Sequence, residues 1–145
     1  IVYTRRLTLP YGRALDCLTG DCPWPETQIG REIGYAMDFY PDLEPRVFLS
    51  YERDSWYAPE SGLRITFDDA IRFRTADLTL DSDLWGTALL RPDQVLMELK
   101  APGAIPLWMV RLLTEMGLYK TSFSKYGTAY QILLEQEYKG GKRYA

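Results

Sequence analysis

Two long segments that alternate apolar and polar residues most constrain the fold of this chain. They cover residues 46–57 and 62–74, and residues 58–62 between them have the composition of a turn. Because side chains of a β-strand point alternately to its two faces, a period of two over this length predicts two strands. The short connection predicts that they form an antiparallel hairpin. The same alternation at residues 95–100, before a Pro-Gly turn, predicts another strand.

Helical segments flank these strands, so the expected fold class is α+β with a mainly antiparallel sheet. Thr27 is a suitable N-cap for the second helix, and Pro41 ends it. A β-rich run at residues 1–9 predicts one more strand, residues 78–90 have no clear pattern, and residues 119–124 are expected to be extended. The expected helices cover residues 13–18, 28–40, 106–116 and 128–138.

The length and apolar content predict one domain. The chain has 145 residues, 46% of them hydrophobic, which suffices for one substantial core. Residues 1–138 are expected to belong to that domain and residues 139–145 to form a frayed basic tail. No apolar run approaches the length of a membrane span and no signal peptide is visible, so a cytoplasmic protein is expected. Since the chain begins at Ile1, we expect it to start partway through a larger reading frame.

The absence of histidine narrows the chemistry. It removes imidazole as a general base, as the partner of a serine or cysteine nucleophile, and as a metal ligand. Cys17 and Cys22 are too few for a tetrahedral zinc site, and we interpret them as free thiols without a role. The formal charge of −3 means that a polyanion would need a local cluster of arginine and lysine. Any catalysis is therefore expected to use carboxylates, lysine, arginine or tyrosine.

Alternation also gathers the charged side chains of the predicted strands. An ordinary sheet with one solvated side would explain this pattern. However, the helices need apolar surface to pack on, so we expect them to cover the apolar strand faces and to leave the charged faces inside a curved sheet. A channel lined by arginine, lysine and one glutamate suits a phosphate chain and a divalent metal. The charged faces are expected to carry Tyr51 with Arg53, Arg64 with Thr66 and Asp68, and Glu98 with Lys100.

Four segments, in this order, resemble the vacuolar transporter chaperone (VTC) type polyphosphate polymerase domain, one of the triphosphate tunnel metalloenzymes. They are Tyr51-Glu52-Arg53, Gly62-Leu63-Arg64-Ile65-Thr66-Phe67-Asp68, Val95-Leu96-Met97-Glu98-Leu99-Lys100 and Ser122-Phe123-Ser124-Lys125-Tyr126. The resemblance covers residues 1–132 and corresponds to the C-terminal part of the domain. It implies part of a tunnel-type β-barrel with helices packed outside. The N-terminal half of the barrel would come from the same or another chain.

The resemblance also implies an activity and a site. The activity is metal-dependent transfer of a phosphoryl group from a nucleoside triphosphate, ATP, to a growing inorganic polyphosphate chain. Mg²⁺ or Mn²⁺ is the implied cofactor, with Glu98 as its ligand. The implied catalytic residues are Arg53, Arg64 and Lys125, and the implied substrate-binding residues are Tyr51, Ser124, Arg6 and Lys100.

Each implied role has a purely structural alternative. Arg53 could form a salt bridge across the hairpin, and Glu98 and Lys100 could form a surface pair. Ser124 could cap the helix that follows Tyr126, and Lys125 could be solvated. Arg72 and Arg74 lie beyond the matching segment and are interpreted as surface charges.

Other functions also remain open. The same tunnel could hydrolyse its substrate as a triphosphatase or nucleotide phosphatase, or the domain could bind polyphosphate as a non-catalytic regulatory module. A nucleic-acid partner is not expected, because it would require a strongly basic face with exposed stacking aromatics.

Overall fold

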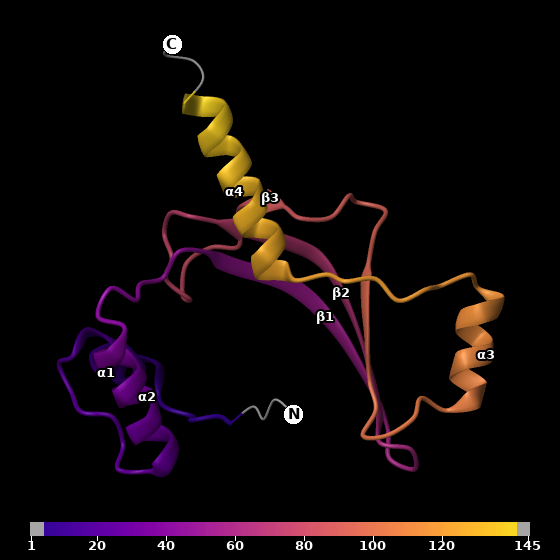
Figure 1. The fold of residues 1–145 in the computed structure, drawn as a ribbon, viewed down its shortest axis with the longest axis horizontal. Helices are drawn as coiled ribbons and strands as arrows, with labels where there is room; N and C mark the ends of the chain where they lie inside the picture. Colours follow the sequence, from indigo (N-terminus) through magenta and orange to yellow (C-terminus); the bar gives the residue numbers. More distant parts are fainter. Residues whose placement is uncertain (1–4, 142–145) are drawn as a thin grey trace. The chain divides into compact units, whose positions relative to one another are not determined.

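A computed structural model describes the backbone of residues 5–141 and the side chains of residues 5–136. The chain divides into two compact units, Ile1–Glu44 and Pro45–Ala145. Four helices and a four-stranded antiparallel sheet make up the described part, which confirms the α+β class (Figure 1). The sheet is open within residues 5–141, so a barrel is not seen there.

The first unit contains two helices, both at predicted positions. Helix α1 covers Tyr11–Thr19 and ends at Gly20, whose φ of 85° is the left-handed conformation that glycine adopts without steric cost. Helix α2 covers Gln28–Phe39, and the hydroxyl of Thr27 accepts a hydrogen bond from the Gly30 amide at 3.1 Å. The predicted N-cap of α2 is therefore confirmed.

The strand expected over residues 1–9 is wrong where it can be checked. Residues 5–10 have no regular secondary structure, and Ile1 to Thr4 lie outside the described residues. A β-rich pattern forms a strand only where another strand offers its backbone N–H and C=O groups. Within residues 5–141, the sheet has no strand from the first unit.

The second unit is built on the predicted hairpin. Strand β1 covers Phe48–Ala58 and pairs antiparallel with β2, Leu63–Arg74. On its other edge β2 pairs with β4, Leu96–Lys100, which confirms the third predicted strand. The unclear region at residues 78–90 is mainly loop and holds only the short strand β3, Thr87–Ala88.

A bulge in β2 reverses its alternation. The register pairs Arg53 with Asp68 and Leu49 with Phe73, so β2 has one more residue than β1 in this interval. Ala70 lies there with a φ of 45°, in the left-handed region. Leu49 and Arg53 are four residues apart on β1 and therefore lie on one face. Because opposed residues of two strands share a face, their partners Phe73 and Asp68 lie on that face as well.

Helix α3 covers Leu107–Glu115 after Pro106, and helix α4 covers Lys125–Gly141. Helix α4 thus begins three residues earlier than predicted and continues through residues 139–141, which were expected to be a frayed tail. Residues 142–145 lie outside the described part.

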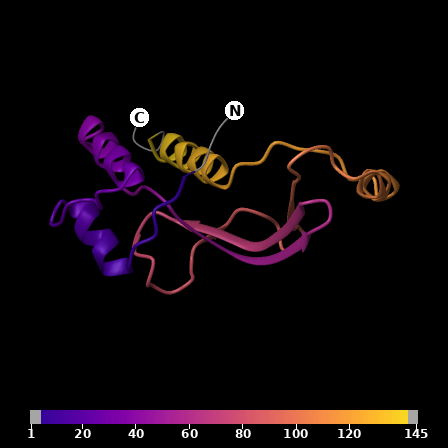
Figure 2. The same cartoon turned by 90° about the horizontal axis from the view of Figure 1, so that it is seen from below.

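The start of α4 lies over the face of the sheet that carries Asp68 (Figures 1 and 2). We expected the helices to cover only the apolar strand faces, and for α4 this is wrong. The reason is twofold: the ion pair between Lys125 and Asp68 anchors the first turn, and the bulge makes the same face apolar farther along. On the opposite face, Trp56 and Phe67 are 66% and 37% exposed.

The helices of the described segment do not have the length and apolarity that a bilayer crossing requires.

Candidate functional site

The register of three strands assembles a polar face, which includes one residue of α4. It pairs Arg53 with Asp68, Thr66 with Glu98 and Arg64 with Lys100. Since directly opposed residues share a face, the alternation expected from the sequence is confirmed for these strands. We use the name polar face for Tyr51, Arg53, Arg64, Thr66, Asp68, Glu98, Lys100 and Lys125.

At the centre of the polar face, Asp68 binds two cations. Its side chain is 0% exposed. Arg53 donates from Nε to Oδ1 at 2.5 Å and from Nη2 to Oδ2 at 2.7 Å, the bidentate geometry of an arginine–carboxylate pair. Lys125 Nζ lies 2.5 Å from Oδ2. The salt bridge considered for Arg53 is thus present, and Lys125, with a side chain 18% exposed, is not simply solvated.

These contacts shift the pKa of both partners within the hairpin. Hydrogen bonding to Arg53, followed by that to Lys125, holds the pKa of Asp68 below its usual range and outweighs burial, which acts in the opposite direction. The same hydrogen bond raises the pKa of Arg53, with a smaller contribution from the charge of Glu98. Asp68 therefore remains a carboxylate, and Arg53 a cation, throughout the neutral range.

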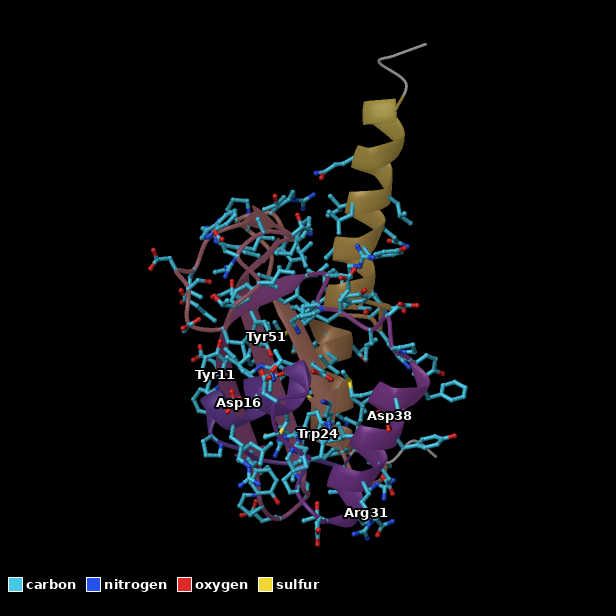
Figure 3. The ribbon with its side chains drawn as sticks, turned by 90° about the vertical axis from the view of Figure 1, so that its left-hand side faces the viewer. Tyr11, Asp16, Trp24, Arg31, Asp38 and Tyr51 are labelled. Atoms are coloured by element: carbon cyan, nitrogen blue, oxygen red, sulfur yellow. The ribbon has the colours of Figure 1, made fainter. Side chains whose placement is uncertain are left out.

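Tyr51 lies beside both cations (labelled in Figure 3). The guanidinium carbon of Arg53 is 4.8 Å from the centre of its ring, and Lys125 Nζ is 4.7 Å from it. Both distances are within the range of cation–π contacts, which favour a fixed position for the charged group. The structure thus brings together three of the residues predicted for the site, from β1 and α4.

The second carboxylate, Glu98, is more accessible. Its side chain is 43% exposed and its Oε1 lies 2.9 Å from Lys100 Nζ. The surface pair considered for these two residues is therefore present, on the polar face itself. Opposite Glu98, the hydroxyl of Thr66 is buried and has no hydrogen-bond partner.

These groups fit a metal that is held mainly by its substrate. Mg²⁺ is commonly bound by one or two carboxylates together with phosphate oxygens and water. Glu98 could supply one carboxylate oxygen to the metal. The unpartnered hydroxyl of Thr66 could form a hydrogen bond with a water molecule bound to the metal. Among the residues whose side chains are described, no group of three or more histidine, cysteine or acidic residues could hold a metal ion by itself.

Two of the predicted substrate-binding residues, Ser124 and Arg6, are not part of the polar face. Ser124 is exposed, and its hydroxyl accepts a hydrogen bond from the Gly127 amide at 3.1 Å. It therefore caps α4 next to Lys125, as the structural alternative expected. Arg6 is exposed in the segment before α1 and belongs to the first unit, so its role stays a prediction.

The interpretation of Arg74 as a surface charge is wrong, whereas Arg72 is exposed as expected. Arg74 is 3% exposed, and its guanidinium lies 3.6 Å from the centre of the Phe48 ring. It donates hydrogen bonds to backbone carbonyls of the loop that follows β2. The bulge turns Arg74 to the face opposite Asp68, and there the loop that follows β2 encloses its guanidinium, which is the physical reason for its burial.

Sequence reasoning placed Asp68 on the charged face but gave it no role. The available signal was its position two residues after Thr66 and four after Arg64 in an alternating strand. A pocket of about 380 Å³ lies elsewhere, lined in part by Phe73 of β2 and Leu133 of α4, and contains no residue of the polar face.

Cys17 and Cys22 are both free thiols, as expected, but they lie close together. Their sulfur atoms are 2.8 Å apart, and the hydrogen bond with Cys17 raises the pKa of the Cys22 thiol. The turn at Gly20, with the Cys22 amide bonded to the Asp16 carbonyl at 3.2 Å, brings the second cysteine back to α1.

The sequence was compared with family models, curated proteins and solved structures, and a family model matches it. No curated protein and no solved structure matches the chain. The family model of the VTC domain matches residues 24–134, well over half of the sequence, and this range contains every residue of the polar face. The chain therefore belongs to the VTC domain family.

Proposed function

We propose that the polar face binds inorganic polyphosphate and that the protein transfers the terminal phosphoryl group of ATP to the end of that chain. Membership of the VTC domain family, which is linked to polyphosphate polymerases, supports this proposal. Four cations against two carboxylates leave the polar face a net charge of +2, in a chain whose formal charge is −3. The local excess of positive charge is what a polyanion site requires.

The observation that carries the proposal is the spread of these cations along the strands. Arg53 is opposite Asp68, and Arg64 lies four residues before Asp68 on β2. At about 3.4 Å per residue, the two arginines are separated by roughly 14 Å along the strand direction. A linear chain of phosphates can lie along both arginines.

Each cation has a distinct use in this proposal. The forks of Arg53 and Arg64 would bind pairs of phosphate oxygens, and Lys100 and Lys125 would act as compact charges. Phosphoryl transfer requires positioning and charge stabilisation more than covalent chemistry, so the lack of histidine is no obstacle.

Glu98 is the proposed ligand of Mg²⁺ or Mn²⁺. When bound, such an ion would neutralise charge on the phosphate oxygens around the transferred group. As the ligand of this ion, Glu98 would orient the transferred phosphoryl group relative to Arg64, which lies on the neighbouring strand β2.

We further propose that the polar face is one wall of a tunnel. Within residues 5–141, β1 has β2 as its strand partner on one edge and none on the other. An unpaired edge of 11 residues is a favourable place for further strands, from the same or another chain, that would complete the wall.

The test is an assay of the full-length protein with ATP and Mn²⁺ or Mg²⁺, with products separated by electrophoresis. We expect long-chain polyphosphate from the wild type and a loss of at least about 100-fold in Glu98→Gln, which keeps the size of the side chain but removes its charge. Glu52→Gln is the matched control, because Glu52 is exposed on β1 and alternates with Arg53 to the opposite face.

Other outcomes would select other functions. Phosphate release without polymer would indicate a triphosphatase or nucleotide phosphatase. Binding of polyphosphate without turnover would indicate a regulatory module. Wild-type activity of Glu98→Gln would refute the metal-binding role of Glu98.

A further inference from the structure

The buried carboxylate of Asp68 lies between two cations that the proposed function uses. Its side chain is 0% exposed, and it contacts Arg53 from β1 and Lys125 from α4. A buried carboxylate is costly unless it is paired and hydrogen-bonded, and this one is paired on both of its oxygens. A residue needed only for folding could be apolar at this position, so its charge calls for a separate explanation.

The contacts with Asp68 leave most donors of both cations available. Arg53 has five N–H bonds, and Asp68 accepts those of Nε and one of Nη2. Lys125 has three, and one is sufficient for its contact with Oδ2. About three N–H bonds of Arg53 and two of Lys125 can therefore still donate to phosphate oxygens.

We propose that Asp68 is a positioning residue that holds Arg53 and Lys125 in the orientation in which their remaining N–H groups bind polyphosphate. This inference rests on the proposed function of the polar face. The bidentate contact fixes the plane of the Arg53 guanidinium, which a single hydrogen bond could not do. Tyr51, in contact with both cations, supports the same arrangement.

Asp68 also connects the start of α4 to the sheet. Lys125 is the first residue of α4, directly after the cap residue Ser124. Its ion pair with Asp68 fixes this end of the helix over β2. The phosphate contacts from β1 and α4 are thereby set by one carboxylate, although these elements are far apart in the sequence.

A different role would be competition, in which Asp68 occupies both cations until polyphosphate displaces it. Displacement would break a bidentate contact and leave a carboxylate without partners in a fully buried place. The geometry therefore favours positioning, and the two roles predict opposite effects of Asp68→Asn. Competition predicts that this substitution raises turnover, and positioning predicts that it lowers turnover.

The experiment compares Asp68→Asn with Asp69→Asn in the full-length protein. Asp69 undergoes the same chemical change, but it is exposed and its neighbour position in β2 puts it on the opposite face. We expect kcat of Asp68→Asn to fall about 10- to 100-fold, the usual effect of losing a residue that orients a catalytic group. The loss of a negative charge from the polar face favours binding of a polyanion and offsets the poorer orientation of the two cations. The affinity of this variant for tripolyphosphate should therefore be no more than about threefold weaker than that of the wild type.

Partial recovery of kcat in Asp68→Glu would support the role of the carboxylate. Unchanged or increased kcat in folded Asp68→Asn would overturn the inference alone. If wild-type protein does not bind tripolyphosphate, the proposed function fails and the inference fails with it.

A second measurement uses the wild-type protein, so it does not depend on the folding of a variant. The Nε–H resonance of Arg53, assigned by its loss in Arg53→Lys, should be slow to exchange with water because Asp68 accepts this proton. On titration with tripolyphosphate it should keep its position while backbone amides of β1 and α4 shift. Movement of the Nε–H resonance to an exposed chemical environment would show that phosphate displaces Asp68, and would overturn the positioning role.

Discussion

Replacement of Arg74 by alanine should destabilise the second unit strongly. The guanidinium is 3% exposed and is surrounded by the loop between β2 and β3. It donates from Nε and Nη2 to the Asp77 carbonyl at 2.9 and 2.8 Å, and from Nη1 to the Asp83 carbonyl at 3.1 Å. It also contacts the Ser82 hydroxyl and lies 3.6 Å from the centre of the Phe48 ring.

The magnitude follows from these contacts. Each carbonyl that loses its hydrogen bond with Arg74 costs about 1 to 3 kcal/mol where water does not replace the donor, and the desolvated cation–π contact adds about 2 kcal/mol. Since the loop can relax and admit water, these values do not add fully. We expect Arg74→Ala to lower the free energy of unfolding by about 3 to 5 kcal/mol. Arg74→Lys should recover less than half of this, because an ammonium group cannot donate in the same fork.

Urea denaturation followed by tryptophan fluorescence gives the free energies of unfolding. Arg72→Ala is the matched control, since Arg72 is exposed on the same strand and has one long hydrogen bond, 3.4 Å, to the Gly86 carbonyl. We expect its effect to remain within about 0.5 kcal/mol. A loss of less than about 1 kcal/mol in Arg74→Ala would refute the view that one buried cation organises this loop.

Three further predictions concern the polar face and the first unit. Because the pKa of Asp68 is lowered, its stabilising contribution is present above the unfolded value of about 3.9 and disappears as pH falls through the folded value. The difference in unfolding free energy between wild type and Asp68→Asn should thus be constant from pH 7 to about 5 and shrink in more acidic solution; a constant difference down to pH 2 would contradict this. Ser124→Asp should retain the cap of α4, whereas Ser124→Ala should cost about 1 kcal/mol. If Ser124 also contacts phosphate, the added charge of Ser124→Asp will weaken tripolyphosphate binding more than Ser124→Ala does, and equal calorimetric affinities would leave it as a cap only. Glutathione disulfide should oxidise Cys17 and Cys22 to one intramolecular disulfide while it is reduced to two glutathione thiols, with a mass loss of about 2 Da that is absent in Cys22→Ser.

Local features of the fold could be predicted because local chemistry decides them. The hydroxyl of Thr27 caps α2 as expected, since a side chain there satisfies a free helical N–H whatever the rest of the fold does. Alternation likewise placed Arg53, Arg64 and Glu98 on a common face once the strands were paired. These predictions needed no contact between distant segments beyond the pairing of strands.

Features that depend on distant segments could not be predicted in the same way. The strand expected at residues 1–9 has a β-rich composition, but composition does not supply a partner strand. Asp68 was visible as a charged residue of β2, yet its role depends on Lys125, which returns to it from α4. Arg74 was interpreted as a surface charge because it lies beyond the segment that resembles the family, but backbone carbonyls of the following loop bind its guanidinium.

The bulge at Ala70 determines where the polar face ends. Uninterrupted alternation would put Arg72 and Arg74 on the same face as Arg64 and Asp68 and would extend the basic surface along all of β2. One additional residue turns both arginines to the opposite face and puts Phe73 in their place. Phe73 and Leu133 of α4 line the same pocket. The helix therefore continues over apolar surface after its first residue, Lys125, has paired with Asp68. The boundary of the proposed phosphate site is therefore set by backbone geometry, whereas a pattern of charges alone would extend the site past Asp68 to Arg74.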